Sequence, residues 1–181
     1  MTPVDFQMRR AQAADSAALA RVQIDSWRSA YVGIVSDEYL AHFTYAEQAQ
    51  DWREIFASNL NDVIYVAEAD QVVGYAWARQ GLGELPDYDA ELLSMHLLPA
   101  WRRRGIGERL LSVVMSALEQ RGVESLFLWT LEKNLPAHKF YEKLGGVRVG
   151  RRDAMIGDCP VVDIAYGWRD LKAHVAQGTF S

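Results

Sequence analysis

The 181-residue sequence contains a single cysteine, Cys159, so no disulfide bond can form within the chain. No apolar run approaches the roughly 18 residues that a membrane-spanning helix needs. The opening residues, MTPVDFQMRR, have no apolar stretch before a small-residue cleavage site, which argues against a secretory signal. These absences predict a cytoplasmic protein with no membrane partner, and a lone thiol suits a reducing compartment.

Excess positive charge is absent too. The 19 lysines and arginines are outnumbered by 24 aspartates and glutamates, which gives a net charge of −5. Binding duplex nucleic acid requires the neutralisation of many phosphates. This chain has only short dense basic runs, which are residues 102–104 and the group Arg148, Arg151 and Arg152. We therefore expect a small polyanionic ligand and no nucleic-acid partner.

Hydrophobic residues are plentiful at 50%, enough for a single domain with a buried core over residues 1–181. β-branched and aromatic runs predict strands at 6–11, 63–68, 72–78, 90–98, 125–131, 147–151 and 161–168. Helical spacing predicts a helix with Asp15 or Ser16 as its N-cap that is interrupted at 31–35, then helices at 37–41, 45–57, 106–121 and 136–144. This order predicts a mixed α+β sheet, because a doubly wound parallel sheet would need strict strand–helix alternation.

The most informative segment runs from Glu91 to Leu111 and predicts a buried strand, a turn at Pro99, a basic loop and a helix. A helix start has unpaired N–H groups and a partial positive charge. Gly105 and Gly107 would let an anion approach these amides. The arginines at 102–104 add charged donors. The pattern favours a phosphate or diphosphate site, although a solvated surface turn is the alternative.

Two other nucleotide-binding motifs do not fit this loop. A dinucleotide-binding fingerprint needs a third glycine where the chain has Leu110, and no Gly-Lys-Ser/Thr follows as a Walker-type loop requires.

Two motifs in this part of the chain resemble signatures of the GNAT superfamily of acyl-CoA-dependent N-acyltransferases. Arg102-x-x-Gly105-x-Gly107 is similar to the family's Arg/Gln-x-x-Gly-x-Gly/Ala. Asn134-x-x-Ala137-x-x-Phe-Tyr-x-x-x-Gly, at residues 134–145, follows with one predicted strand between. The resemblance is specific over residues 91–150 and general before them. One departure is a Gly145-Gly146 pair where the family usually has Gly-Phe, which removes an aromatic that often packs on the sheet.

The resemblance implies a mostly antiparallel central sheet flanked by helices, in which the strands near Met95 and Phe127 splay apart. It implies acetyl-CoA as co-substrate and no metal. Backbone groups exposed by the splay would pair with the pantetheine arm, and amides from Arg103 to Glu108 would bind the diphosphate. The implied cofactor-binding residues are Met95, His96, Leu97, Arg102, Arg103, Arg104, Gly105, Ile106, Gly107, Glu108, Asn134, Ala137 and Tyr141.

The implied reaction is acetyl transfer to a primary amine by direct attack in a ternary complex. Tyr141 is the candidate acid for the leaving thiolate, although Phe-Tyr can also be a core pair. For the proton of the amine we favour Glu91, while His96, Glu132 and water stay open. Cys159 is expected to be a buried thiol, because no Cys–His motif accompanies it.

The acceptor is less well defined by the sequence. Trp27 and Tyr31 lie one helical turn apart and would form one aromatic wall, unless they are ordinary core residues. Glu84, Asp87 and Asp89 make a loop acidic, which would attract a cationic amine or simply be solvated. A peptide N-terminus, a lysine, a polyamine and an amino sugar all stay open. A non-catalytic coenzyme A-binding sensor or scaffold is the alternative function, and a homodimer is compatible with the family.

Overall fold

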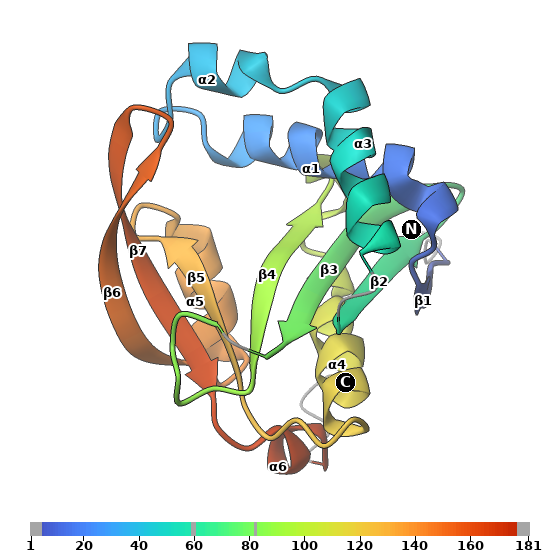
Figure 1. The fold of residues 1–181 in the computed structure, drawn as a ribbon, viewed down its shortest axis with the longest axis vertical. Coiled ribbons are helices and arrows are strands. Elements are labelled where there is room, and N and C mark those ends of the chain that lie inside the picture. The colour runs from blue at the N-terminus through green and yellow to red at the C-terminus, as the bar shows by residue number, and fades with distance from the viewer. Residues whose placement is uncertain (1–4, 59–60, 82, 177–181) are drawn as a thin grey trace.

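The computed structural model describes residues 5–58, 61–81 and 83–176 (Figure 1). Residues 1–4 and 177–181 of the predicted domain lie outside the described residues. The first residues of the stretch considered for a secretory signal are among them. No helix in the described part of the chain is long and apolar enough to cross a membrane.

A seven-stranded sheet forms the centre of the fold, in the order β1-β2-β3-β4-β5-β7-β6. Among these strands only β4 and β5 pair in parallel, and every other neighbouring pair is antiparallel. This is the predicted mixed α+β sheet. The strands are β1 (Gln7–Arg10), β2 (Asp62–Glu68), β3 (Val72–Gln80), β4 (Ala90–Leu97), β5 (Leu126–Leu131), β6 (Val147–Ile156) and β7 (Cys159–Trp168).

Helices cover both faces of the central strands. In chain order they are α1 (Ser16–Ala30), α2 (Asp37–His42), α3 (Tyr45–Ala57), α4 (Ile106–Glu119), α5 (Leu135–Lys143) and α6 (Leu171–Ala176). Single 3-10 turns precede α1 and follow β4. Helix α4 packs on β2 and β3, while α1 packs on β3 and β4 (Figure 1). Strand β3 is buried on both sides as a result, and its Tyr75 contacts Trp52 of α3 with ring centroids 5.1 Å apart.

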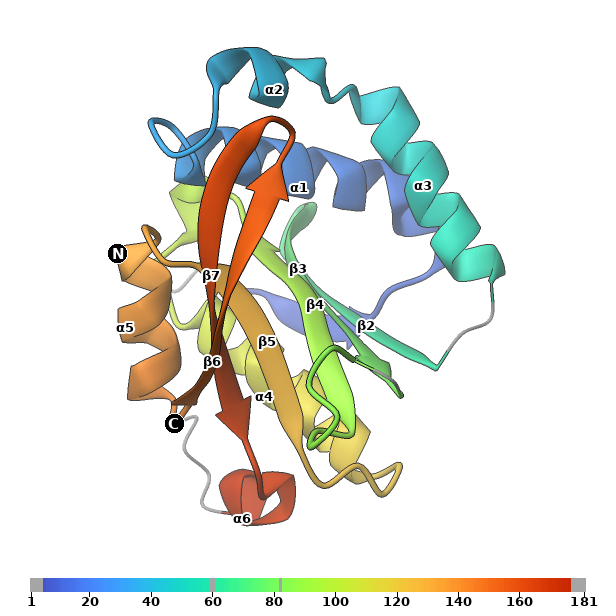
Figure 2. The same ribbon diagram turned by 60° about the vertical axis from the view of Figure 1, so that its left-hand side comes forward.

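The β6–β7 hairpin is longer than the predicted strands at 147–151 and 161–168. Strand β6 lies at the sheet edge, where charged residues and an exposed Met155 hide the apolar alternation of a strand. Pro160 counts against a strand interior but is tolerated beside the hairpin tip. The tip reaches α2, where Gly157 leaves room for the Tyr39 ring (Figure 2). Cys159, predicted to be buried, is only half-buried here.

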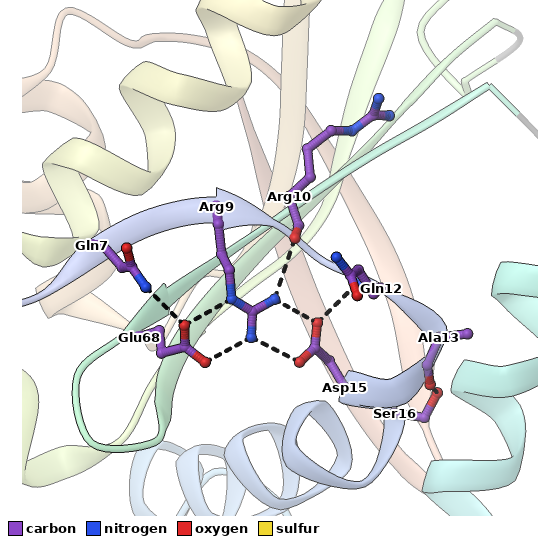
Figure 3. Close-up of polar contacts among 8 residues, drawn as sticks. All are labelled: Gln7, Arg9, Arg10, Gln12, Ala13, Asp15, Ser16 and Glu68. Carbon is purple, nitrogen blue, oxygen red and sulfur yellow. Dashed lines mark hydrogen bonds and ion pairs between the residues drawn. The ribbon is translucent and has the colours of Figure 1, made fainter.

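The start of α1 is held by an ion-pair network around Arg9 (Figure 3). The Arg9 guanidinium donates to both oxygens of Glu68 on β2, at 2.8 and 2.7 Å. It also donates to both oxygens of Asp15, at 2.8 and 2.9 Å. Hydrogen bonds from Arg9 lower the pKa of each carboxyl. Asp15, predicted as a candidate helix cap, occupies the capping position, but its side chain makes no cap hydrogen bond to α1.

We expect Arg9→Met to lower the free energy of unfolding by about 2 kcal/mol at neutral pH, since the pairs are partly buried. The folded pKa values of Asp15 and Glu68 lie below their unfolded values. Their stabilisation is therefore present above the unfolded pKa and is lost as the pH falls through the folded pKa. Urea unfolding of both proteins from pH 7 to pH 2 checks this. Equal stability at pH 7, or a difference that persists undiminished in acid, would contradict it.

Candidate active site

Strands β4 and β5 are paired at one end only. Their register contains Ala90 with Leu126 and Glu91 with Phe127, and no further pair follows. Beyond that point the two strands diverge in both views of the fold (Figures 1 and 2). The β5-facing edge of β4 therefore carries backbone groups without a strand partner, which agrees with the splay that the family resemblance implies.

A β-bulge decides which residues of β4 face this open edge. The Ala90 N–H donates to the carbonyl just before β5 (3.2 Å), whereas the Leu98 N–H donates to a carbonyl of β3 (2.9 Å). In a regular strand, residues an even number apart point their N–H groups to the same edge. The register with β3 passes from Leu92 to Ser94 and leaves Leu93 unpaired, which reverses the alternation.

The reversal separates the three residues predicted to bind the pantetheine arm. Because the Leu98 N–H faces β3, the backbone groups of His96, two residues earlier, also face β3, where His96 pairs with Tyr75. Those of Met95 and Leu97 face the open edge. In a strand without the bulge, the backbone groups of His96 would face the open edge, and those of Met95 and Leu97 would face β3.

The predicted anion loop lies at the beginning of α4. Gly105 occupies the N-cap position with φ +78°, and no side chain caps the helix. The first backbone bond of the helix joins the Arg109 N–H to the Gly105 carbonyl at 3.1 Å. Within the described residues, the N–H groups of Ile106, Gly107 and Glu108 consequently have no acceptor. Three uncapped amides at a helix N-terminus form a site for an anion.

The two glycines of this loop have different roles. A Cβ on Gly105 would meet no atom within 4 Å, so this glycine is required by its left-handed backbone and not by crowding. A Cβ on Gly107 would lie 3.2 Å from the Phe140 ring. Gly107 thus lets α5 pack against the first turn of α4, in addition to any access that it gives an anion.

The three arginines of the loop point to different partners. Arg102 turns toward α1 and donates to the Ser29 hydroxyl at 3.3 Å, and desolvation lowers its pKa. Arg104 lies over the Trp101 ring, 5.0 Å from its centroid. Arg103 is exposed and has an unusual φ of +64°. Arg103 and Arg104 are therefore better placed than Arg102 to contact a bound anion.

Opposite charges meet between α4 and α5. Glu108, in the first turn of α4, forms an ion pair with Lys143 near the end of α5. This pair offsets a carboxylate that would otherwise weaken an anion site at the helix N-terminus.

Helix α5 begins at the second predicted motif. The Asn134 side chain accepts a hydrogen bond from the Ala137 N–H (3.4 Å), and Pro136 fits the first turn. At the other end, Trp168 of β7 fills the space beside Gly146, where a Cβ would lie 2.8 Å from the indole. The Trp168 indole also donates to the Leu144 carbonyl at 2.8 Å. Trp168 supplies the aromatic packing that the Gly-Gly pair lacks.

Tyr141 lies on α5 and is 8% exposed. Its ring packs against Tyr166, Trp168 and Phe140, at centroid distances of 5.9, 6.2 and 5.2 Å. No described residue hydrogen-bonds to its hydroxyl. Burial, and to a smaller extent the nearby Tyr31, raise its pKa above the usual value. The phenol is therefore protonated throughout the neutral range and can act as an acid.

His96 is engaged by α1. Its Nε2 accepts from the Trp27 indole N–H (3.1 Å), so its Nδ1 carries the proton and faces the Ser26 hydroxyl (3.2 Å). Burial lowers its pKa to about 4, and Arg102 contributes. A neutral imidazole whose lone pair is already bonded is poorly placed to accept another proton.

The two carboxylates among the candidate bases differ in environment. Glu91 is half-buried where β4 and β5 pair, and burial raises the pKa of its carboxyl. No described side chain hydrogen-bonds to it, although Arg79 lies opposite on β3. The Glu132 side chain is 50% exposed and lies 3.7 Å from Arg151. Burial therefore makes the Glu91 carboxylate a better proton acceptor than a solvated glutamate.

The predicted aromatic wall is present at the end of α1. Trp27 and Tyr31 make an edge-to-face contact with centroids 5.4 Å apart, and both are half-buried. Burial raises the pKa of Tyr31, with a smaller contribution from Asp163 of β7. Because Tyr31 also raises the pKa of Tyr141, the wall lies close to the candidate acid.

The acidic loop before β4 is already paired. Glu84 forms an ion pair with Arg152, and Asp87 lies 3.7 Å from Arg169. Asp89 accepts from the Ser125 hydroxyl at 3.0 Å and fixes the chain before β5. Little free negative charge is left here to attract a cationic amine.

A cluster near Tyr31 was not predicted. Asp163 is 8% exposed and accepts two bonds from Arg152, at 3.0 and 2.9 Å. Arg152 lies over the Trp129 ring, 4.2 Å from its centroid, and the buried Trp129 indole N–H has no described partner. Alternation along β5 and β7 places these side chains on one face, but without a sheet order the two strands could not be matched.

Comparison with known proteins gives a consistent result. Residues 24–146 match the Acetyltransferase (GNAT) family. The chain is 32% identical to YuaI, an uncharacterized N-acetyltransferase of Bacillus subtilis, over 92% of this chain and 94% of that protein. It is 26% identical to a spermidine N(1)-acetyltransferase of Thermoplasma acidophilum, over 78% and 88%.

Solved structures share the fold. The PaiA N-acetyltransferase of Thermoplasma acidophilum, in complex with coenzyme A, superposes with a TM-score of 0.72 at 23% identity and covers 91% of this chain and 99% of that one. YncA, a putative acetyltransferase of Salmonella typhimurium solved with acetyl-CoA, has a TM-score of 0.68 at 18% identity and covers 91% and 93%.

Proposed function

Because this chain belongs to the acetyltransferase (GNAT) family and is an acetyl-CoA-dependent N-acetyltransferase, we propose that it acetylates a primary amine by direct attack in a ternary complex. One observation carries the proposal: an open edge of β4 is combined with an uncapped helix N-terminus at α4, whose Gly107 lies beside Leu97 and Phe140, and with a buried tyrosine on α5. Such an arrangement can bind a diphosphate, an extended amide-containing arm and a thiolate leaving group in succession.

The cofactor would bind mainly to backbone groups. The amides of Met95 and Leu97 would pair with the pantetheine arm, as an added strand does at a sheet edge. The diphosphate would sit on the amides of residues 106–108, with Arg103 and Arg104 beside it. The Asn134 side chain lies at the start of α5, where its amide nitrogen stays available to the arm.

The chemical steps would divide between two side chains. The amine must lose a proton to attack the thioester, and we assign its acceptance to Glu91, through water where distance requires. A backbone N–H near Leu97 would stabilise the tetrahedral oxyanion. As the C–S bond breaks, the Tyr141 hydroxyl would protonate the departing thiolate.

The acceptor would reach the thioester past Trp27 and Tyr31. The relative described as a spermidine N(1)-acetyltransferase supports a primary amine as the attacking group. A small molecule and a peptide both fit this proposal, and a cytoplasmic location stays a prediction.

Gly105 and Gly122 provide a matched pair for testing the diphosphate site. Both have φ +78°, and a Cβ on either meets no atom within 4 Å. We expect Gly105→Ala and Gly122→Ala each to lower the free energy of unfolding by about 1 kcal/mol. Only Gly105→Ala should weaken coenzyme A binding, by about tenfold, because strain there moves amides that bind the diphosphate. Calorimetric titration measures this, and equal affinities in the two variants would contradict the assignment.

Tyr141→Phe tests the enzymatic function. We expect wild-type protein to release free thiol from acetyl-CoA with at least one amine among a polyamine, a lysine peptide and an amino sugar. The variant should lose about a hundredfold in kcat with little change in KM for acetyl-CoA. Tyr65→Phe, at a partly buried tyrosine of β2 without a described hydroxyl partner, is the control. Unchanged kcat in Tyr141→Phe would remove the acid assignment, and no turnover of any amine would remove the acceptor class.

Glu91→Gln tests the base. The raised pKa predicts that wild-type kcat declines as the pH falls through it, because only the carboxylate accepts a proton. The variant should be slow at neutral pH, should lack this decline and should recover partly at alkaline pH, where more of the amine is already neutral. A pH–rate profile that matches the wild type would exclude Glu91.

A further inference from the structure

Behind Tyr141, a hydrogen-bond network joins α5 to β5, β6 and β7. His138, 5% exposed, lies one turn before Tyr141 on the same helix. Its Nε2 lies 3.0 Å from the carbonyl oxygen of Glu132, the residue after β5, and its Nδ1 lies 2.9 Å from the Tyr166 hydroxyl on β7. His138 therefore bridges the helix that carries Tyr141 and the sheet on which the helix packs.

The Tyr166 hydroxyl has two further partners. It donates to the Glu142 carboxylate at 2.8 Å and accepts from Arg148 Nε at 2.9 Å. Arg148 also donates to Glu142, at 3.1 and 3.2 Å. Glu142 is the residue after Tyr141, so the network holds α5 on both sides of the candidate acid.

The partners of the network fix the direction of several contacts. The Glu132 carbonyl can only accept, so His138 Nε2 donates to it. The Glu142 carboxylate accepts from the Tyr166 hydroxyl, and the Tyr166 oxygen accepts from Arg148. The His138 ring thus joins a carbonyl at one nitrogen and a hydroxyl with two further partners at the other.

One buried ring ties α5 to the sheet. The charged or titratable groups that face the His138 ring are Glu142 of α5, Arg148 of β6 and Tyr166 of β7, while Glu132 presents its carbonyl. Removal of the imidazole or of the Tyr166 hydroxyl would therefore loosen the attachment of α5 to β7.

Tyr141 depends on this attachment because it has no polar anchor of its own. No described residue hydrogen-bonds to its hydroxyl, and its ring lies 5.9 Å from that of Tyr166. We propose that His138 is a positioning residue that fixes α5 on β7 through its two ring nitrogens and so places the Tyr141 hydroxyl at the departing thiolate. The proposal rests on the acid role of Tyr141 proposed above.

The test compares His138→Phe and Tyr166→Phe, each made in the wild type and in Tyr141→Phe. Both variants retain an aromatic ring, and Tyr166→Phe removes only the hydroxyl in case His138→Phe folds poorly. Lys139→Gln, which removes an exposed cation from the same helix, is the control. Thiol release gives kcat and KM for each protein.

We expect each single variant to lose about tenfold in kcat, with KM for acetyl-CoA within about twofold of wild type. In the Tyr141→Phe background neither substitution should lower kcat further. Lys139→Gln should keep the wild-type kcat and KM.

Two results would overturn the proposal. An equal further loss in the Tyr141→Phe background would mean that His138 does not act through Tyr141. Unchanged kcat in both variants would exclude a positioning role. By contrast, wild-type kcat in Tyr141→Phe alone would refute the acid assignment itself, so the two failures are distinguishable.

Discussion

The early end of β4–β5 pairing is the constraint on which the rest of the site depends. After Glu91 and Phe127 the two strands separate, and β4 keeps a partner on one side only. Unpaired backbone groups inside a protein require another partner. The bulge at Leu93 determines which groups are left, since it turns Met95 and Leu97 toward the gap. The separation of the strands opens the edge, and one unpaired residue selects the backbone groups that face it.

The two helices that follow β4 and β5 contribute the uncapped amides and the candidate acid of the site. Helix α4 contributes amides that Gly105 leaves uncapped, and Gly107 lets Phe140 of α5 approach it closely. Helix α5 contributes Tyr141, whose burial raises its pKa and keeps the phenol protonated. Because α5 touches both α4 and β7, contacts far from the reacting atoms, such as those of His138, can influence where the Tyr141 hydroxyl lies.

The sequence predicted the parts of the fold that local patterns encode. Strand periodicity, the helix starting after Gly105 and the order of elements all follow from neighbouring residues, and the GNAT-like motifs agree with the family match. Features that depend on pairing between distant strands were not predictable. The apolar run around Leu93 does not reveal that this residue forms a bulge. Asp163 and Trp129 come together only because β7 pairs with β5. The full length of β6 was hidden by its exposure at the sheet edge.

Residue-resolved amide hydrogen exchange, with and without coenzyme A, tests the central claim most directly. In the free protein the His96 amide should already be protected by its bond to β3, while the Met95 and Leu97 amides exchange faster. Coenzyme A should slow exchange at Met95, Leu97 and residues 106–108 and leave His96 nearly unchanged. Protection that appears at His96 while Met95 and Leu97 stay unprotected would contradict the bulge-defined edge.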